Sequence, residues 1–513
     1  MPIIIPPPFN TPSPISLVLG QCLLVYTVAS EATRNPPPGI ARLWFLFGVM
    51  LWNAYALVDP AFPFVDNWSV DRDPEIASLT EAERTTRFSF LLYLVWNTII
   101  ATFMPSLPTL QSAGIVVVTT PPTDYYAALQ AHNVFATYVA ERSTDGYTAA
   151  SDPSYVYPNK GYYIKVYQDP TGKPVQNLTT DLPDPTTWCP LEVHYTNGTV
   201  TRQKPVLPAF GRVLNWFSSA QLTDMNEIAS SLYPPLSSSL FQQQKRSFVE
   251  IQASLTDADK VNAEVWAGTE PARTSPPGKL FVFIAVVLMS QGSRYRAREA
   301  VAMFSGLSFA MFHAAISSWA VKYTFLQPRP IQIIRQDYFT GYVTNPVTGN
   351  VVPGGIWVPY QQFQETNTGG SVTPGFPDYV SGHSVFSMAA ASFLQMLTGT
   401  DTVPVNNTDM IDPVQVLHPI AHIFDPMTRP CNWVNILVPP MAAKTASNVP
   451  IDAVPQLWTS WTTIAQIVGM SRVWGGIHWM QSNYAGLQLG EWVGLKMHEM
   501  IDFSSLGLDF NLS

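Results

Sequence analysis

The sequence has few charged residues and little positive charge. Charged residues make up 12% of its 513 positions, and 27 Lys and Arg stand against 36 Asp and Glu, which gives a formal net charge of −9. A chain with this balance lacks the basic surface that binds nucleic acids and anionic membranes. We therefore expect no nucleic-acid partner, and any site for an anion must be local, built by a few basic side chains.

Cysteine is also rare. Cys22, Cys189 and Cys431 lie far apart and show neither a Cys-x-x-Cys nor a Cys/His ligand spacing, which argues against a disulfide framework and a structural zinc site. No Lys or Arg precedes the first apolar run, so the usual form of a secretory signal is missing. We expect a soluble protein. Its compartment and oligomeric state stay open, with the cytoplasm slightly favoured.

Hydrophobic residues, in contrast, are abundant at 47%, and 46 prolines divide the chain. Apolar helices separated by long loops are typical of a large helical bundle. We predict an all-α protein of two packed helical bundles with long proline-rich loops and short β-hairpin decorations. Residues 1–235 would form an N-terminal helical scaffold with hairpin insertions, and residues 236–513 would form a C-terminal bundle that carries the functional site.

Local sequence patterns predict where the individual helices and hairpins lie along the chain. Ser78 followed by Glu81 predicts a capping box, and turn residues predict hairpins around 162–172, 192–198 and 342–352. The segment 300–321 is long enough to cross a membrane, but it contains four serines and His313, and the mean hydropathy is only +0.09. We therefore favour a buried core helix over a membrane span. Periodicity predicts helices at 15–31, 40–58, 79–104, 125–142, 236–253, 256–267, 278–291, 296–323, 382–398, 457–470 and 484–502.

Three segments combine residues that carry chemistry. The first is KYTFLQPRP, which places Lys322 and Arg329 seven residues apart. Seven residues are close to two helical turns, so a helix that continues to Arg329 would present both cations from one face. Pro328 would end that helix and let the guanidinium turn toward a shared centre. Taken alone, the segment is equally explained by a solvated helix end.

The second segment, FPDYVSGHS at 376–384, runs into an apolar helix. Ser381 is a natural N-cap, and the unpaired amides after it form an anion site at the helix start. Gly382 lets an anion approach the backbone, and His383 on the first turn is placed to transfer protons. A capped core helix is the simpler explanation of this segment by itself.

The third segment is SRVWGGIHW at 471–479. On an unbroken helix Arg472 and His478 would point in different directions, but the pair Gly475 and Gly476 permits a turn that brings them together. An arginine beside a neutral imidazole can hold an anion while a ring nitrogen stays available to coordinate or attack. An isolated structural histidine is the alternative interpretation.

Taken together, the three segments supply the parts of one oxyanion site. Three cations and neutral donors can hold the equatorial oxygens of a tetrahedral anion, with one histidine on the axis and the other as acid/base. No Asp or Glu is offered for direct coordination, so phosphate or vanadate fits better than a divalent metal ion. The set comprises Lys322, Arg329, Ser381, Gly382, His383, Arg472 and His478. We interpret the other histidines as structural.

The order K-x6-R-P, S-G-H and S-R-x5-H resembles the superfamily of type-2 phosphatidic acid phosphatases, bacterial acid phosphatases and vanadium-dependent haloperoxidases. Trp319 and Phe376 resemble the aromatic pair near the cofactor in the chloroperoxidase-type members, which points to that branch. The resemblance implies a halide pocket at this pair, His478 as the vanadate ligand and His383 as the acid/base. It also implies that the oxyanion is bound by Lys322, Arg329, Ser381, Gly382, Arg472 and His478.

The resemblance further implies a reaction and its rivals. Hydrogen peroxide, deprotonated by His383 and polarised by Lys322, would oxidise chloride or bromide to hypohalous acid through a peroxovanadate, and an organic acceptor would be halogenated. An acid or lipid phosphatase that forms a phosphohistidine at His478 is the first alternative. A catalytically inactive scaffold that retains the pocket is the second.

Two departures from the family pattern bear on the site. Val380 stands where the family usually has proline before Ser-Gly-His, which should leave the helix cap intact. Ser482 stands where an aspartate is common, four residues after His478. A carboxylate there would orient the imidazole and raise its basicity, so its absence counts more against a phosphatase than against vanadate ligation. We expect His478 to be positioned by a carbonyl group or by Ser482.

Overall fold

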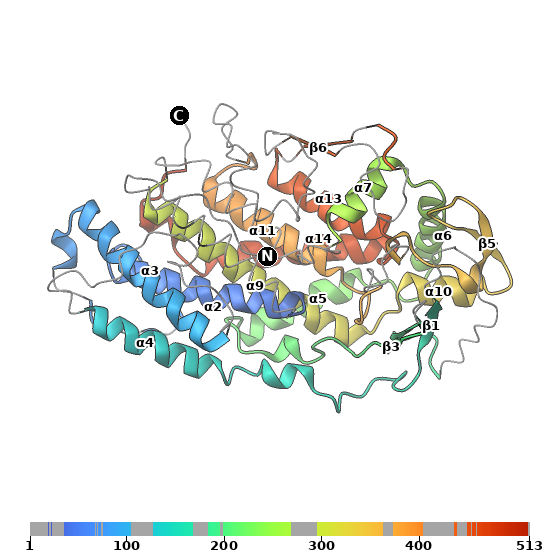
Figure 1. Ribbon diagram of the computed structural model, residues 1–513, viewed down its shortest axis with the longest axis horizontal. Coiled ribbons are helices and arrows are strands. Elements are labelled where there is room, and N and C mark those ends of the chain that lie inside the picture. The colour runs from blue at the N-terminus through green and yellow to red at the C-terminus, as the bar shows by residue number, and fades with distance from the viewer. Residues whose placement is uncertain are drawn as a thin grey trace.

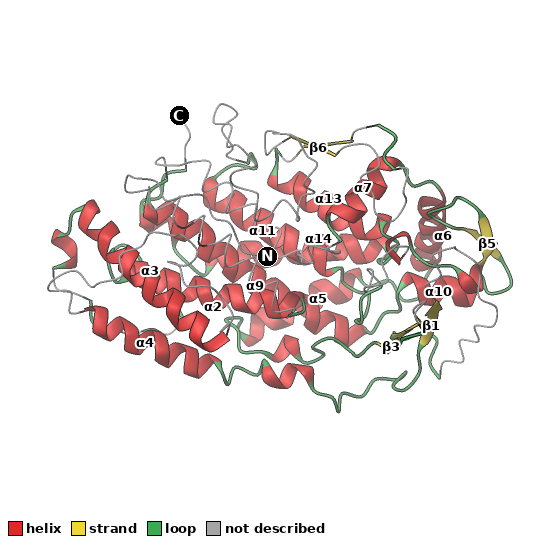
Figure 2. Ribbon diagram, in the orientation of Figure 1, coloured by secondary structure: helices red, strands yellow, loops and turns green. Residues whose placement is uncertain are grey.

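The computed structural model is predominantly helical, as Figure 2 shows, with a few short strands at its periphery. The predicted segments 15–31 and 278–291 lie almost wholly outside the described residues, so their helices stay predictions. The structure describes residues 19, 22, 35–66, 68, 70–72, 75–103, 127–167, 183–194, 198–267, 295–362, 373–403, 435–438, 449–452, 454–457 and 459–510.

The helices follow the predicted order. Two more, α5 and α10, are present that periodicity did not predict. The described α-helices are α2 (Pro37–Ala56), α3 (Glu81–Phe103), α4 (Ala127–Arg142), α5 (Ser219–Leu232), α6 (Ser239–Ala253), α7 (Asp257–Val265), α9 (Ala297–Phe325), α10 (Pro330–Asp337), α11 (Gly382–Thr398), α13 (Trp461–Trp474) and α14 (Met480–Glu499). Short 3₁₀ helices are η1 (Ile76–Ser78), η2 (Thr148–Ser151), η3 (Phe210–Arg212), η4 (Gly354–Ile356), η5 (Tyr360–Gln362) and η6 (Phe503–Leu506).

The long helix α9 lies at the centre of the fold. It packs against α2, α11 and α14 (Figure 1), and all but a few of its residues are buried. Two of its four serines are satisfied locally, since Ser308 Oγ donates to the Ser305 carbonyl at 2.6 Å and Ser318 Oγ donates to the Ala314 carbonyl at 2.7 Å. Such bonds let a mostly apolar helix carry hydroxyl groups in a core without a desolvation penalty.

Two of the described helices are long and apolar enough to cross a membrane by length and composition, α3 and the continuous stretch of α9 and α10. The apolar window of the second is completely buried inside the protein. The segment 300–321 is therefore a core helix in this fold, as predicted. One continuous apolar core joins α2 and α3 to the C-terminal helices, and the predicted boundary at residues 235 and 236 stays a prediction.

Close backbone approach explains how α2 fits against α9. A Cβ atom at Gly48 would lie 1.8 Å from Ser308 Oγ, so only glycine permits this crossing. The helix α2 begins with two prolines in its first turn, where the missing amide hydrogen costs no helical hydrogen bond. Helix α4 packs on α3, at the edge of the bundle (Figure 1).

The strands form three small sheets. The first contains β1 (Ile164–Tyr167), β2 (Leu191–His194) and β3 (Val200–Arg202), the second β4 (Tyr342–Thr344) and β5 (Val351–Pro353), and the third β6 (Asn435–Val438) and β7 (Val454–Leu457). The predicted hairpins at 192–198 and 342–352 are present as antiparallel pairs. Of the predicted hairpin at 162–172 the structure describes only the strand β1, which pairs with β2 in parallel, and the predicted turn lies outside the described residues.

The predicted capping box is displaced by two residues. Ser78 lies in η1 and donates to the Glu75 carbonyl, so its hydroxyl does not cap a helix. The box is instead formed by Thr80 and Glu83: the Thr80 amide donates to the Glu83 carboxylate at 2.8 Å, and the Glu83 amide donates to Thr80 Oγ1 at 3.3 Å. Both pairs have the same spacing in the sequence, which is why the pattern alone did not separate them.

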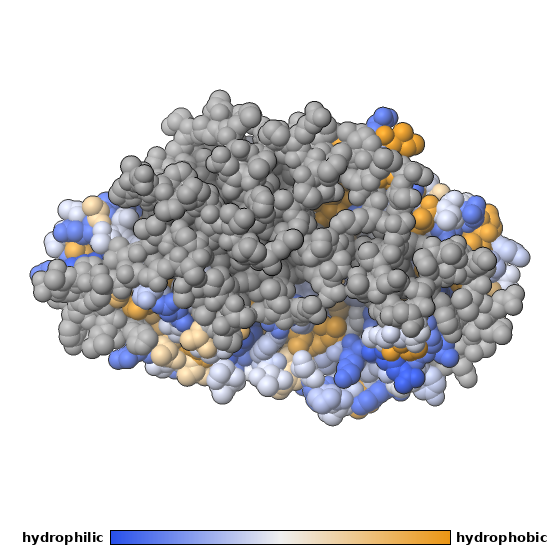
Figure 3. Space-filling model, viewed as in Figure 1, coloured by the Kyte–Doolittle hydropathy of each residue, from blue (hydrophilic) through white to orange (hydrophobic). Residues whose placement is uncertain are grey.

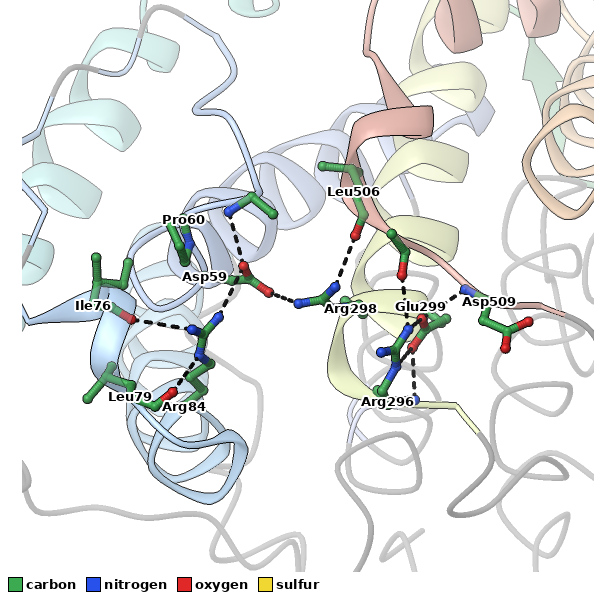
Figure 4. A network of polar contacts seen from close by, with 12 residues as sticks. Asp59, Pro60, Ile76, Leu79, Arg84, Arg296, Arg298, Glu299, Leu506 and Asp509 are labelled. Carbon is green, nitrogen blue, oxygen red and sulfur yellow. Dashed lines mark hydrogen bonds and ion pairs between the residues drawn. The ribbon is translucent and has the colours of Figure 1, made fainter.

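A buried ionic network joins the end of α2, the first turns of α3 and α9, and η6 (Figure 4). The Asp59 carboxylate, just after α2, lies 2.6 Å from Arg298 Nη2 of α9 and 3.3 Å from Arg84 Nη1 of α3. Arg298 also donates to the Leu506 carbonyl of η6 at 3.1 Å. The Asp59 side chain is 1% exposed, so removing it would leave two arginines without their charge partner. The described residues visible in Figure 3 carry hydrophilic and hydrophobic side chains in small mixed groups.

Candidate functional site

The first two cations come from the two sides of a helix break. Helix α9 ends at Phe325, and Leu326 takes a left-handed conformation with φ of 51° as the cap. Arg329 is the N-cap of α10, whose first helical residue is Pro330. The helix does not continue to Arg329, so the condition for both cations to share one helix face is not met: the chain turns before Pro328, and the turn rather than helical spacing sets the direction of the guanidinium.

The loop before α11 supplies the backbone carbonyl groups that accept hydrogen bonds from these two cations. Lys322 Nζ donates to the Pro377 and Asp378 carbonyls, both at 2.9 Å. Arg329 Nε donates to the Phe376 carbonyl at 2.9 Å. The Phe376 ring lies under both cations, with its centroid 5.0 Å from Lys322 Nζ and 4.9 Å from Arg329 Cζ, a geometry that stabilises positive charge.

Helix α11 begins beside this pair. Ser381 is its N-cap, and Ser381 Oγ accepts from the Ser384 amide at 3.4 Å. A Cβ atom at Gly382 would lie 3.5 Å from the Trp319 ring and 4.0 Å from Lys322 Cε, so the unsubstituted backbone faces the lysine. The Trp319 and Phe376 rings are in contact, with their centroids 5.0 Å apart. The aromatic pair and the helix start thus lie together at Lys322.

The glycine pair turns the chain from α13 toward the same place. Helix α13 ends at Trp474, and Gly476 has φ of 76°, a conformation that favours glycine. The Ile477 amide donates back to the Arg472 carbonyl at 3.1 Å. The predicted turn is present, and His478 follows it just before α14.

His478 and Arg329 are in direct contact. Arg329 Nη1 donates to His478 Nε2 at 2.9 Å and to the Ile477 carbonyl at 2.7 Å. A guanidinium has only donors, so Nε2 accepts and the proton of the neutral ring is on Nδ1. The nitrogen that would face an oxyanion therefore presents a lone pair. Arg329 Nη2 is buried and has no hydrogen-bond partner among the described residues.

Arg472 lies next to this cluster but is held mainly by other groups. Its Nη1 donates to Gln361 Oε1 at 2.6 Å, its Nη2 to the Ala263 carbonyl at 2.6 Å, and its Nε to Ser471 Oγ at 2.9 Å. Three of its five N–H groups are used in this way. Its charge still reaches His478, whose pKa it helps to lower.

His383 is half-buried on the first turn of α11. Its Nε2 lies 2.9 Å from the Trp266 carbonyl, which can only accept, so Nε2 is the donor. Its charge, when present, also lowers the pKa of His478. Sequence analysis did not predict the Trp266 contact, because the two residues are far apart in the sequence.

A carboxylate that sequence analysis did not assign completes the cluster. Asp378 is fully buried, and its Oδ1 lies 3.0 Å from His478 Nδ1. Ser482 Oγ lies 3.3 Å from the same nitrogen, as predicted for that residue. The acidic residue stands inside the second motif, four residues before Gly382, but nothing in its spacing indicates a contact with a residue 100 positions later.

Burial governs protonation in the cluster. Loss of hydration lowers the pKa of Lys322 well below its usual range, lowers that of Arg329 to about 10, and lowers that of Arg472 to about 9. It also lowers the pKa of His478, and the neighbouring cations act in the same direction. Burial raises the pKa of Asp378 to about 7, against the opposing effect of Arg329 and Lys322. The imidazole is therefore neutral at pH 7.

The balance of buried charge indicates an anionic ligand. Lys322, Arg329 and Arg472 are each at most 1% exposed. Among the described residues, Asp378 is the buried carboxylate that lies beside them. Buried charge that lacks a partner is costly, so a dianion would compensate the cluster. The described residues contain no group of three or more His, Cys, Asp or Glu that could hold a metal ion.

Among the other histidines, His194, His313 and His498 have structural partners, and the side chain of His132 lies outside the described part of the structure. His313 accepts from the Trp216 amide at 3.0 Å through Nε2, and its Nδ1 lies 2.8 Å from the Phe309 carbonyl. His194 lies 3.0 Å from the Glu192 carboxylate, and His498 stacks on Phe503. The positions 418 and 422 lie outside the described residues.

Known proteins resemble this chain in sequence pattern or in fold. Residues 302–504 match the family model described as VCPO second helical-bundle domain. The chain is similar to a bacterial vanadium-dependent chloroperoxidase in its holo form, with a TM-score of 0.62, 16% identity, and coverage of 92% of this chain and 94% of that one. The apo form of such an enzyme gives a TM-score of 0.62 and 16% identity over 91% and 94% of the two chains.

A bacterial vanadium-dependent iodoperoxidase is also similar, with a TM-score of 0.53, 14% identity, and coverage of 96% of this chain and 98% of that one. No curated protein matches the chain. At these identities the solved structures establish the fold, and the family model covers the helices that bring together Lys322, the start of α11 and His478. Residues 302–504 thus match the model of the VCPO second helical-bundle domain, and the chain shares the fold of the bacterial vanadium-dependent haloperoxidases.

Proposed function

We propose that this protein is a vanadium-dependent haloperoxidase, which uses hydrogen peroxide to oxidise chloride or bromide to hypohalous acid and so halogenates an organic acceptor. The observation that carries the proposal is the group of three buried cations beside the lone pair of His478 Nε2. The shared fold supports the proposal because its solved examples include vanadium-dependent chloroperoxidases and an iodoperoxidase.

The residues present fit a bound vanadate. Arg329 Nη2 is a buried donor with no partner in the described structure, and Lys322 uses two of its three N–H groups on carbonyls. Ser381 and Gly382 open α11, where backbone amides and the positive end of the helix favour an anion. These residues and Arg472 would hold the oxygens, and His478 Nε2 would be the ligand. Vanadate would act as a Lewis acid that activates peroxide without changing its own oxidation state.

The protein side chains then have distinct tasks. His478 must give up its contact with Arg329 Nη1, so that Nε2 is available to the oxyanion. His383 is proposed to take the proton from hydrogen peroxide. Lys322, which is buried and donates to two carbonyls, would use its remaining N–H to bind and polarise the oxygens of the anion. The Trp319 and Phe376 rings exclude water and shape the halide pocket.

One observation favours the phosphatase as a second candidate. A phosphohistidine mechanism requires a well-oriented, basic imidazole, and the absence of an aspartate at position 482 counted against it. Asp378 now supplies a carboxylate 3.0 Å from His478 Nδ1. Phosphate and vanadate are nearly the same size and shape, so the pocket suits both.

Two assays on the same preparation separate these functions. We expect vanadate and hydrogen peroxide to support halogenation of a phenolic dye, with little hydrolysis of p-nitrophenyl phosphate. We expect His478→Ala to lose vanadate binding and turnover, and His383→Ala to retain binding but lose turnover. The reverse pattern of activities would identify a phosphatase, and absence of both activities together with absence of vanadate binding would identify an inactive scaffold.

A further inference from the structure

The buried carboxylate of Asp378 has no role in the reaction described above. Its side chain is fully buried, and its nearest titratable neighbour is His478, at 3.0 Å from Oδ1 to Nδ1. Ser482 Oγ is farther from that nitrogen, at 3.3 Å. The carboxylate thus lies on the side of the imidazole opposite the nitrogen that faces Arg329.

The contact with Arg329 indicates which ring nitrogen carries the proton. Arg329 Nη1 donates to His478 Nε2 at 2.9 Å, and a guanidinium cannot accept, so the proton is on Nδ1. That proton faces Asp378 and Ser482. A negative carboxylate stabilises the Nδ1–H form more strongly than a hydroxyl does, because hydrogen bonds with a charged partner are roughly twice as strong.

The backbone of Asp378 is fastened on three sides. Its carbonyl accepts from Lys322 Nζ at 2.9 Å and from Ser482 Oγ at 3.0 Å, and its amide donates to the Gln327 carbonyl at 2.9 Å. These bonds join the loop before α11 to the end of α9 and to α14. A side chain on such a fixed point can hold the direction of a ring, which a mobile loop could not.

The carboxylate does not improve stability in an obvious way. Neither oxygen of Asp378 makes a hydrogen bond of good alignment in the described structure, and a buried polar group without one costs free energy. The contact with His478 therefore lacks ideal geometry while Arg329 occupies Nε2. Moving Arg329 to an oxyanion would free the ring to rotate slightly and align its Nδ1–H with Oδ1.

We propose that Asp378 is the positioning residue of His478, which holds the imidazole as the Nδ1–H tautomer and so presents Nε2 to the oxyanion. In the family pattern an aspartate at the position of Ser482, in α14, orients this histidine. Here we assign the same role to Asp378, which lies in the loop before α11. The inference rests on the proposed function only in that it takes His478 as the ligand of the oxyanion.

The test compares vanadate affinity and the tautomer of His478 in four variants. In Asp378→Ala we expect the dissociation constant for vanadate, measured by calorimetry, to rise by about 10- to 100-fold. Asp378→Asn retains an acceptor oxygen, so we expect a smaller loss. Ser482→Ala removes the longer contact with Nδ1 and one of the three hydrogen bonds to the Asp378 backbone but keeps the carboxylate, and we expect a change of about fivefold or less.

The fourth variant relocates the carboxylate. Asp378→Ala combined with Ser482→Asp places an acid where the family pattern has it, and we expect it to recover most of the affinity that Asp378→Ala loses. A purely structural role for Asp378 predicts no such recovery. If Asp378→Ala fails to fold by circular dichroism, Asp378→Asn and the double variant decide the question.

The tautomer is read without any ligand. In protein labelled with ¹⁵N-histidine, the two ring nitrogens of His478 have different chemical shifts according to which carries the proton, and His478→Ala assigns them. We expect the Nδ1–H form to predominate in the wild type and its share to fall in Asp378→Ala, in which Arg329 still favours that form but the carboxylate does not. An unchanged tautomer and unchanged vanadate affinity in Asp378→Ala would overturn the inference. A wild type that binds phosphate but not vanadate would overturn the proposed function alone, since phosphate then serves as the probe.

Discussion

Replacing Arg329 with lysine tests whether the guanidinium fork, and not only its charge, builds the site. Arg329 uses Nε on the Phe376 carbonyl at 2.9 Å and Nη1 on the Ile477 carbonyl at 2.7 Å, and it leaves Nη2 without a partner in the described structure. A single ammonium group cannot reach all three directions. The variant therefore keeps the charge but loses a donor to the oxyanion.

The size of the effect follows from the lost bond. A hydrogen bond to a charged group contributes about 1.5–3 kcal/mol, and each 1.4 kcal/mol changes affinity about tenfold. We expect the vanadate dissociation constant of Arg329→Lys to rise roughly 10- to 150-fold, measured by calorimetry on the metal-free protein. The matched control is Arg335→Lys, an equally buried arginine that donates to the Trp357 and Lys165 carbonyls.

The control separates binding from folding. Both variants lose hydrogen bonds to carbonyls, so both should lower the free energy of unfolding, but only Arg329→Lys should weaken vanadate. Wild-type affinity in Arg329→Lys would refute the assignment of this guanidinium to the oxyanion. An equal loss of affinity in Arg335→Lys would show that the effect comes from general destabilisation.

Three further predictions concern stability. Burial lowers the pKa of His313 to about 4. Between about pH 6.5 and pH 4 this histidine is therefore protonated in the unfolded chain but neutral in the folded protein. The free energy of unfolding should fall by roughly 3 kcal/mol as the pH drops over this range. Denaturant titrations should show this slope reduced in His313→Gln, and an unchanged slope would exclude His313 as its cause. At Gly476, φ is 76° and a Cβ atom would lie 2.6 Å from the nearest side-chain atom, so Gly476→Ala should lower the free energy of unfolding by about 3 kcal/mol. The control Gly349→Ala has φ of 70° but open space around the Cβ position, and it should lower the free energy of unfolding by only about 1–2 kcal/mol. Equal losses of stability in the two variants would contradict the steric argument. Asp59→Ala leaves two arginines without their carboxylate and should lower the free energy of unfolding by about 3 kcal/mol. The control Glu141→Ala changes an exposed residue and should change the free energy of unfolding by less than about 0.5 kcal/mol. Similar values for the two variants would show that the ionic network does not stabilise the fold.

The helices could be predicted largely from the sequence because their signals are local. The segment 382–398 matches α11, since Ser381 caps its start and Gly399 ends it. The predicted segment 457–470 begins too early because residues 454–457 form β7, and Ser460 caps α13 instead. Helix α10 has only eight residues, too few for periodicity to reveal.

The composition of the site was predictable, but its geometry was not. Lys322, Arg329 and the glycine turn at 475–476 were identified from residue types and order, although a turn between α9 and α10, and not one helix face, sets the direction of Arg329. Asp378 was missed because its contact with His478 joins residues 100 positions apart. Only the fold determines that a loop before α11 and a turn after α13 meet at one imidazole.

A vanadate titration of the metal-free protein tests the central claim most directly, namely that the basic side chains and His478 bind one tetrahedral oxyanion. We predict a single site per chain by calorimetry, competition by phosphate at that site, and halogenating activity that rises in proportion to its occupancy, with none of these in His478→Ala. Vanadate binding of the same strength and stoichiometry in His478→Ala would contradict the account.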